Sequence, residues 1–248
     1  MGKIKILRIL HRASVSGPTH QASILQDKLN DEYFESKLLV GRIDSNEENG
    51  EYILKNRNID YIILPFSRGF NVFNELKSIL SIIKIIRKFK PDIVHIHASK
   101  PGFLGRIIAY ILGVKVIIHT FHGHVFHSYF NSVISKLVIL TERFLGLITD
   151  KIIVISKKQK NEIGHFLNLS NKTKIIPLGL DLAKFKNYDS NVRISFRKKF
   201  GVKDNEFCIG IVGRLTAVKD HKLFIDIANS ILNRSNLKFK FLIVGGGE

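Results

Sequence analysis

Hydrophobic and polar positions divide this chain into two alternating kinds of segment. Short runs of consecutive apolar residues, such as Ile4–Leu10 and Val114–Ile118, are typical of strands covered on both faces of a sheet. Longer segments between them repeat their apolar positions with helical spacing. The pattern predicts strands at 3–10, 36–41, 60–64, 92–97, 114–120, 151–155 and 174–177, and helices at 19–30, 73–89, 101–112, 132–148 and 157–167.

Strands that alternate with helices predict right-handed βαβ units and an open, mostly parallel sheet, so the fold class is α/β. The same pattern restarts after residue 190, with helices at 192–200 and 221–232 and strands at 207–212 and 238–244. We therefore expect a Rossmann-like domain at 1–178, a linker at 179–190 and an incomplete second domain at 191–248. About 60 residues bury too little surface for a stable domain, so the sequence is interpreted as C-terminally truncated.

The charge balance is strongly basic, with 39 Lys and Arg against 21 Asp and Glu, a net charge of +18. Such an excess favours polyanions or anionic membrane surfaces as partners. The chain shows no secretory signal, and no apolar stretch reaches the ~18 residues of a membrane span, which favours a cytoplasmic location. The single cysteine, Cys208, cannot form an intrachain disulfide, and we expect it to be buried as a small apolar residue.

Candidate binding residues of the first domain follow its strands, because ligands of open α/β sheets bind beyond the carboxyl ends of strands. Gly17 precedes a helix, where backbone can approach an anion, although any βα turn can hold one glycine. His95 and His97 share one face of a strand. Their pairing could ligate a metal, but a third ligand with defined spacing is missing, and we expect no metal. The tract 119–127 is rich in histidine, and we interpret it as a sugar or phosphate pocket rather than a metal site.

Two loops of the second domain carry a similar signal. Gly213 follows a strand, and Arg214 and Lys219 stand five residues apart just before a helix. Together they could clamp a diphosphate, or they could be two solvated loop cations. The glycines 245–247 follow the next strand, where bare backbone amides can line a ligand, but their spacing is not that of a dinucleotide site.

With these residues in place, the chain resembles family 4 of the retaining GT-B glycosyltransferases, in the variant that builds bacterial surface polysaccharides or lipid-linked oligosaccharides. The matching segments keep their order across nearly the whole chain: Pro91–His97, Ser99–Arg106, His119–Phe126, Ile176–Asp181 with Phe185, and Gly213–Leu215 with Lys219 and Asp220. The resemblance implies two Rossmann-like parallel-sheet domains, the second only partly present.

The resemblance also implies roles for single residues. His122 matches the histidine beside the donor sugar, and Arg214 and Lys219 match the pair that neutralises the leaving diphosphate, so these three are the candidate catalytic residues. The candidate substrate-binding residues are Gly17, His97, His124, Gly213, Gly246 and Gly247. Ser16 and Leu178 depart from the family pattern, and its two-glutamate motif would lie beyond Glu248.

The activity implied is metal-independent transfer of a hexosyl or N-acetylhexosaminyl group from a nucleoside-diphosphate sugar, with UDP expected, to a lipid-linked or polysaccharide acceptor. The nucleotide sugar is a substrate, so no cofactor is expected. The 248-residue chain itself is expected to be inactive, or a non-catalytic binding remnant. The alternative from charge alone is a polyanion or nucleic-acid binder, but the basic residues are scattered and show no nucleic-acid-binding signature.

The helix predicted at 73–89 leaves a further question open. Its apolar positions Phe73, Leu76, Ile79, Leu80, Ile83 and Ile86 form a stripe edged by Lys77, Lys84, Arg87, Lys88 and Lys90. Such a helix suits the surface of an anionic membrane, which would place the protein peripherally on the inner face of the cytoplasmic membrane. It equally suits a core-facing helix with a solvated basic side.

Overall fold

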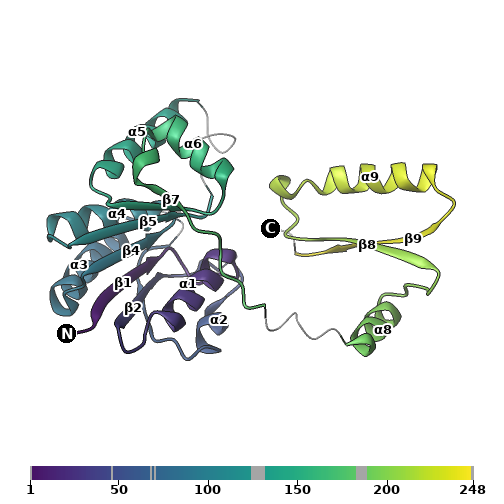
Figure 1. Cartoon of the computed structure of the whole chain (residues 1–248), viewed down its shortest axis with the longest axis horizontal. Helices are drawn as coiled ribbons and strands as arrows, with labels where there is room; N and C mark the ends of the chain where they lie inside the picture. Colours follow the sequence, from purple (N-terminus) through teal and green to yellow (C-terminus); the bar gives the residue numbers. More distant parts are fainter. Residues whose placement is uncertain are drawn as a thin grey trace. The chain divides into compact units, whose positions relative to one another are not determined.

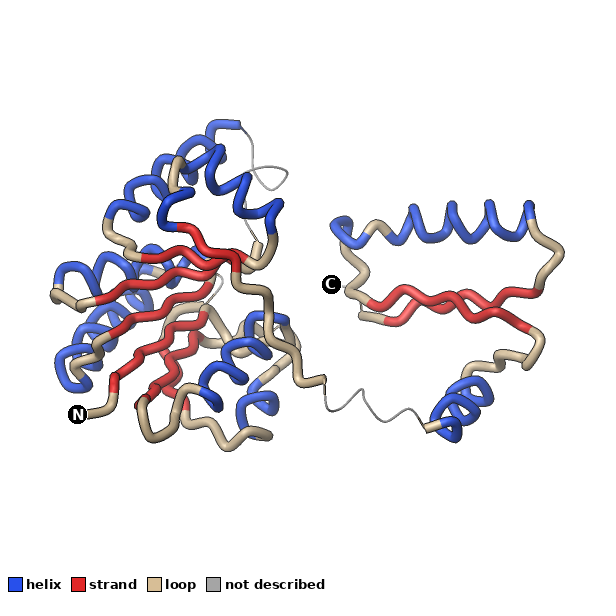
Figure 2. The backbone as a smooth tube through the Cα atoms, in the orientation of Figure 1, coloured by secondary structure: helices blue, strands red, loops and turns tan. Residues whose placement is uncertain are grey.

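A computed structural model of the chain describes residues 2–45, 47–67, 69, 71–123, 132–182 and 189–246. The chain divides into two compact units, Met1–Leu180 and Asp181–Glu248, which are shown in Figures 1 and 2. The boundary at Leu180 lies inside the range 179–190 that the sequence suggested as a linker.

The described part of the first unit is built on a seven-stranded sheet in the order β3-β2-β1-β4-β5-β6-β7. Every neighbouring pair of strands is parallel, as the apolar runs predicted. The strands are β1 (Ile4–Leu10), β2 (Phe34–Gly41), β3 (Tyr61–Leu64), β4 (Ile93–His97), β5 (Val116–Phe121), β6 (Lys151–Val154) and β7 (Thr173–Ile175). The order reverses between β1 and β4, which makes this the switch point of a doubly wound sheet.

Helices cover both faces of this sheet (Figure 1). They are α1 (Gly17–Lys28), α2 (Glu51–Lys55), α3 (Val72–Phe89), α4 (Ser99–Ile111), α5 (Ser132–Leu147) and α6 (Lys157–Leu167), with a 3-10 turn at Ser170–Lys172. Leu7 and Ile9 of β1 pack against α3 and α4, whereas Leu10 packs toward α1 and α2. A third cluster joins Phe121 and Val154 to α5 and α6. One strand thus supplies core residues to both sides, which is why its sequence does not alternate.

Glycine lets α4 lie close to the sheet. A Cβ atom on Gly105 would approach the side chains of Ile9 and Ile96 to 3.2 and 3.3 Å. A Cβ atom on Gly102 would lie 2.8 Å from the Cε1 atom of His119. These two positions therefore fix the distance between α4 and the strand ends that hold the candidate site.

The second unit contains α8 (Ser190–Lys199), β8 (Glu206–Val212), a 3-10 turn at Ala217–Lys219, α9 (His221–Arg234) and β9 (Lys238–Val244). β8 and β9 pair in parallel, as expected for one βαβ crossover. Among the described hydrophobic residues of this unit, only Val202 is buried. A unit of this size that buries so little surface is marginally stable without further packing. The expectation that Cys208 is buried is wrong: its side chain is exposed, because nothing described covers that face of β8.

Several boundaries differ from those read from the sequence. The five-residue helix α2 was not among the elements read from the sequence, and α4 begins at Ser99 rather than at residue 101. The apolar stripe of α3 also divides. Ile79, Ile83 and Ile86 pack on the core, whereas Phe73, Leu76 and Leu80 are exposed. Among the described residues, no helix combines the length and the apolar character that a membrane span needs.

Candidate functional site

The carboxyl edge of the first sheet brings together three residues singled out from the sequence. Gly17 is the first residue of α1, which follows β1, and His97 is the last residue of β4. His122 directly follows β5, the next strand along. All three lie at or beside the switch point, where ligands of this fold class bind. A Cβ atom on Gly17 would meet no atom within 4 Å, so close packing within the chain does not explain the glycine.

The backbone is strained where β4 ends. Ala98, which follows His97, has φ 71° and ψ 164°. This region of the backbone map is essentially confined to glycine, and an alanine there costs of order 1–3 kcal/mol. Ala98 is also the N-terminal cap of α4, so the strained residue sets the direction in which that helix leaves the sheet.

His97 and His122 form a hydrogen-bonded imidazole pair. The Nδ1 atom of His97 lies 2.9 Å from the Nε2 atom of His122, and the ring centroids are 5.1 Å apart and nearly parallel. His97 is fully buried beneath the strand edge, and His122 is half-buried. Burial lowers the pKa of His122 to about 4, and burial, followed by the charges of neighbouring groups, lowers the pKa of His97 well below its ordinary value. Both rings are therefore neutral near pH 7, able to donate and accept hydrogen bonds.

Buried polar groups continue from this pair into the sheet. The His95 ring lies 4.3 Å from that of His97, and its Nε2 atom lies 2.8 Å from Oγ1 of Thr120. Arg8 on β1 stands opposite His95 in the strand register and donates to Oε1 of Gln26 at 2.8 Å. Burial lowers the pKa of Arg8 to about 10, which keeps it cationic, and its charge lowers the pKa of His95 further.

On the opposite face of the sheet, α4 and α5 are joined by a buried ion pair. Nη2 of Arg106 lies 2.7 Å from Oε2 of Glu142, and Nε of Arg106 donates to the carbonyl oxygen of Gly102 at 2.7 Å. His119 lies beside this pair under α4, and both of its ring nitrogens are buried without a described partner. Arg106 belongs to the sequence motif at 99–106, and the structure gives it a packing role.

The described histidines of this edge meet as a pair. In the part of the chain that the structure describes, no cluster of three or more His, Cys, Asp or Glu side chains has the geometry of a metal site. The imidazole pair shares one hydrogen bond, which uses a nitrogen on each ring.

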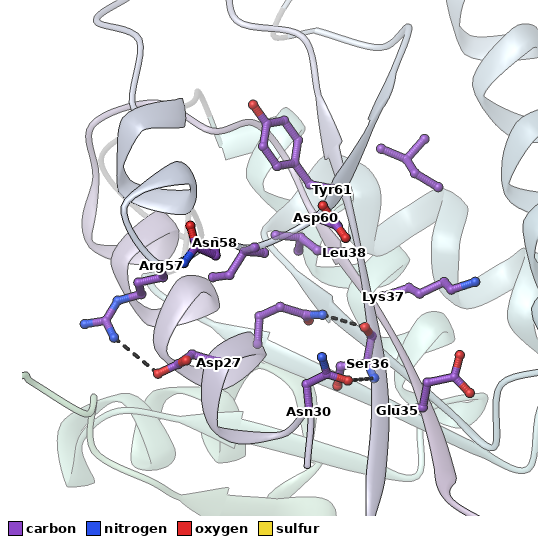
Figure 3. A pocket seen from close by; sticks show the side chains of 13 residues that line it. Asp27, Asn30, Glu35, Ser36, Lys37, Leu38, Arg57, Asn58, Asp60 and Tyr61 are labelled. Carbon is purple, nitrogen blue, oxygen red and sulfur yellow. Dashed lines mark hydrogen bonds and ion pairs between the residues drawn. The ribbon is translucent and has the colours of Figure 1, made fainter.

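Among the hollows on the described part of the first unit, two lie at opposite ends of its strands. The larger, about 510 Å³, is lined by residues at the start of β2 and β3 (Figure 3). Some of its polar groups are already paired: Arg57 with Asp27, and Asn30 with the amide of Ser36. The second, about 490 Å³, lies at the carboxyl ends, where Ala13, Gly41 and Arg42 line it. Only the second adjoins the edge that carries the candidate residues.

The candidate phosphate loop of the second unit is tied to the strand ends by its backbone. The amide of Gly213 donates to the carbonyl of Val244, and the amide of Leu215 donates to the carbonyl of Gly246, at 2.9 and 2.8 Å. A Cβ atom on Gly245 would lie 1.9 Å from the carbonyl oxygen of Gly213, so only glycine allows the two loops to approach.

Arg214 and Lys219 both have exposed side chains in this loop, and the aliphatic part of Lys219 packs over Gly213. The 3-10 turn Ala217–Lys219 brings Lys219 back beside the start of the loop. Two cations at the carboxyl end of a strand and before a helix N-terminus form a surface suited to phosphate oxygens.

Two residues that support this loop were given no role in the sequence analysis. Nε2 of His221 lies 2.9 Å from the carbonyl oxygen of Arg214, and the side chain of Asp220 caps α9 by accepting from the amide of Leu223. An Asp followed by a His at the start of a predicted helix is the sequence feature that could have indicated this support.

The remaining histidines and glycines singled out above need separate comment. His124 and Gly247 lie outside the described residues. His11 directly follows β1 and therefore lies at the same carboxyl edge as His122. His11 is accordingly unsuitable as a control position, whereas His165 on the exposed side of α6 is suitable.

Comparison with known proteins identifies the family. The model of Glycosyltransferase Family 4 matches residues 25–184, well over half of the chain. The chain belongs to glycosyltransferase family 4. An Escherichia coli relative, UDP-Gal:alpha-D-GlcNAc-diphosphoundecaprenol alpha-1,3-galactosyltransferase, is 32% identical over 190 residues, covering 76% of this chain and 49% of the relative. The Staphylococcus aureus capsular polysaccharide biosynthesis glycosyltransferase CapM is 28% identical over 192 residues, covering 75% and 49%.

The fold agrees with this family. The crystal structure of Anabaena HepE in complex with UDP and glucose superposes with a TM-score of 0.76 at 17% identity, covering 99% of this chain and 62% of that one. The predicted GT-B class is thus confirmed, with the second domain present in part. This family 4 chain spans about half the length of the curated relatives it matches.

Proposed function

We propose that the protein is a retaining, metal-independent glycosyltransferase that moves a sugar from a UDP-sugar to a lipid-linked or polysaccharide acceptor. Its membership of family 4 establishes the class. The observation that carries the proposal further is the loop Gly213–Asp220, where Arg214 and Lys219 stand at a strand end before a helix N-terminus. Cations held there stabilise the charge of a departing diphosphate.

In the proposed reaction the bond between the anomeric carbon and the diphosphate oxygen breaks, and the acceptor oxygen bonds to the same face of the sugar. The acceptor hydroxyl gives its proton to the leaving diphosphate, so no cofactor is consumed. Arg214 and Lys219 stabilise the growing negative charge, and His122 hydrogen-bonds the transferred sugar as a neutral imidazole. Gly17, Gly213 and Gly246 let backbone amides approach the donor.

The substrate classes come from the relatives. The Escherichia coli relative is named as transferring galactose from UDP-Gal to a diphosphoundecaprenol-linked sugar, and the Staphylococcus aureus relative as acting in capsule synthesis. We propose a hexose or N-acetylhexosamine donor and an acceptor of the same kind. We further propose that the 248-residue chain alone is inactive, because its second unit buries so little apolar surface among the described residues.

A lipid-linked acceptor requires the enzyme to reach a membrane, and helices α3 and α5 offer a surface for this. On α5 an apolar stripe faces outward with each side chain 59–73% exposed: Val133, Leu137, Leu140, Phe144 and Leu147. On α3 the exposed Phe73, Leu76 and Leu80 lead into an exposed basic half containing Lys84, Arg87 and Lys88. Apolar side chains insert into the lipid boundary, and each cation near an anionic surface adds about 1 kcal/mol. We therefore propose peripheral attachment at the cytoplasmic face.

Vesicle co-sedimentation tests this attachment. The full-length protein should bind anionic vesicles better than neutral ones, and the triple change Lys84→Glu, Arg87→Glu and Lys88→Glu should abolish the difference. The matched control makes the same change of charge on α6, at Lys157, Lys158 and Lys160. Equal binding to both kinds of vesicle, or equal loss in both triple variants, would count against the proposed surface.

Enzyme kinetics test the transfer reaction itself. In the full-length protein, Arg214→Ala and Lys219→Ala should each lower kcat/KM by about 30- to 1,000-fold, equivalent to about 2–4 kcal/mol of transition-state stabilisation. Lys222→Ala, an exposed cation three residues further on, is the matched control and should change kcat/KM little. Near-normal turnover in both loop variants would refute the assignment.

A further inference from the structure

The hydrogen bond between His97 and His122 requires a choice of tautomer. Because both rings are neutral, only one of the two facing nitrogens, Nδ1 of His97 or Nε2 of His122, carries the shared proton. The remaining nitrogen of each ring, Nε2 of His97 and Nδ1 of His122, is buried and has no described hydrogen-bond partner. The choice therefore decides which of these two atoms is an unpaired donor.

Burial favours one of the two arrangements. A buried N–H group without an acceptor is rarer, and costs more, than a buried acceptor without a donor. If His122 donates, the unpaired N–H belongs to His97, which has no solvent exposure at all. If His97 donates, the unpaired N–H belongs to His122, the half-buried residue at the strand edge. The second arrangement moves the unmet donor from the fully buried ring of His97 to the half-buried ring of His122.

The charge of Arg8 acts in the same direction. β4 lies between β1, which carries Arg8, and β5, which leads to His122. The guanidinium of Arg8 is fully buried, with Nε and Nη2 lacking described partners. A cation on the β1 side of His97 favours the tautomer whose proton lies on the β5 side, at Nδ1. His95, whose ring centroid lies 4.3 Å from that of His97, is also neutral and adds no competing charge.

We propose that His97 is a positioning residue that donates its Nδ1 proton to Nε2 of His122 and so fixes His122 in the Nδ1–H tautomer. His122 then presents a hydrogen-bond donor, not a basic lone pair. This inference rests on the proposed function only for its consequence: a donor at this atom suits a hydroxyl or ring oxygen of the transferred sugar. The tautomer itself is a property of the first unit.

Long-range ¹H–¹⁵N correlation spectra of the 248-residue chain with labelled histidine test the tautomer directly, since protonated and bare ring nitrogens have well-separated shifts. His122→Gln identifies the signals of His122. We expect Nδ1 of His122 to be protonated and Nε2 to be bare. A protonated Nε2 on His122 in the wild-type chain would overturn the proposal without reference to any activity.

Two variants separate positioning from mere packing. The amide of His97→Asn occupies the place of Nδ1 and can still donate, whereas His97→Leu fills similar space and cannot. His122 should keep its Nδ1–H form in the first variant and lose it in the second. In the full-length enzyme, kcat should fall about tenfold or more with His97→Leu and severalfold less with His97→Asn. Equal losses in both would refute positioning, while loss of the tautomer without any change in kcat would refute the role proposed for His122 and leave the tautomer standing.

Discussion

Mild acid should unfold the first unit, because its sheet edge holds several histidines that the folded chain keeps neutral. Burial is the main cause in each case, and it lowers the pKa of two of them to about 4 and of three well below the ordinary value of 6.5. They are His11, His95, His97, His119 and His122. Below about pH 6.5 the unfolded chain binds protons at these rings, whereas the folded chain does not. Stability is therefore fully present above that pH and is lost as the pH falls toward 4.

The expected loss is large relative to the stability of a typical domain. Each such histidine lowers the free energy of unfolding by about 1.4 kcal/mol per pH unit below its unfolded pKa. Between pH 7 and about pH 5.5 this amounts to about 1 kcal/mol for one ring and to several kcal/mol for the five together. Domains are typically stable by about 5–15 kcal/mol, so the unit should lose most of its stability before most carboxylates titrate.

Urea unfolding followed by circular dichroism, repeated at intervals from pH 7.5 to 5, measures this dependence. His95→Gln and His119→Gln each remove one titrating ring and should reduce the slope of unfolding free energy against pH by about 1.4 kcal/mol per unit. His165→Gln, on the exposed side of α6, controls for the substitution. A loss below about 2 kcal/mol between pH 7 and 5.5 would show that the folded sheet accommodates imidazolium, and would refute the reasoning.

Three further predictions follow from single contacts. Arg106→Met leaves the Glu142 carboxylate buried without its partner and should lower the free energy of unfolding by about 3–5 kcal/mol. The double variant Arg106→Met with Glu142→Leu should recover most of this loss. A double variant as unstable as the single one would contradict this reasoning. Gly102→Ala places a Cβ atom 2.8 Å from the nearest imidazole carbon and should cost about 1–3 kcal/mol in urea unfolding. In the full-length enzyme, His122→Ala should lose transfer activity while His165→Ala keeps it, and chelators should have no effect; activity lost to a chelator and restored by zinc would revive the metal hypothesis.

The parallel sheet could be read from the sequence because burial on both faces leaves a direct trace. A run such as Ile4–Leu10 has no polar face, and the lengths between runs fit one crossover helix each. The short helix α2 left no such trace. With five residues it has too few turns for periodicity, and it is held by its surroundings: Ile53 and Leu54 are buried, and Glu51 accepts a hydrogen bond from Tyr61.

The sequence could predict that the candidate residues lie at one edge of the sheet, but not which side chains contact each other there. Gly17, His97 and His122 could be placed at strand ends, because parallel strands point their carboxyl ends the same way. That His97 lies beneath His122 depends on the register of β4 and β5, which pairs His97 with Thr120. Nothing in the sequence marks Ala98 as strained, since alanine gives no hint of a positive φ. On α3, helical spacing identified an apolar stripe but could not tell that Leu80 faces solvent while Ile83 faces the core.

The phosphate loop of the second unit and the strand edge of the first unit differ in charge. This difference fits the proposed donor, which has a charged diphosphate and an uncharged sugar. The loop of the second unit presents exposed cations, Arg214 and Lys219, which match a diphosphate whose negative charge grows as it leaves. The edge of the first unit carries a neutral imidazole pair, because burial lowers the pKa of both His97 and His122, and neighbouring charges, that of Arg8 among them, lower the pKa of His97 further. A cation there would compete for the diphosphate and would oppose positive charge developing on the sugar ring. In the proposed reaction His122 therefore offers the sugar a hydrogen bond and no charge.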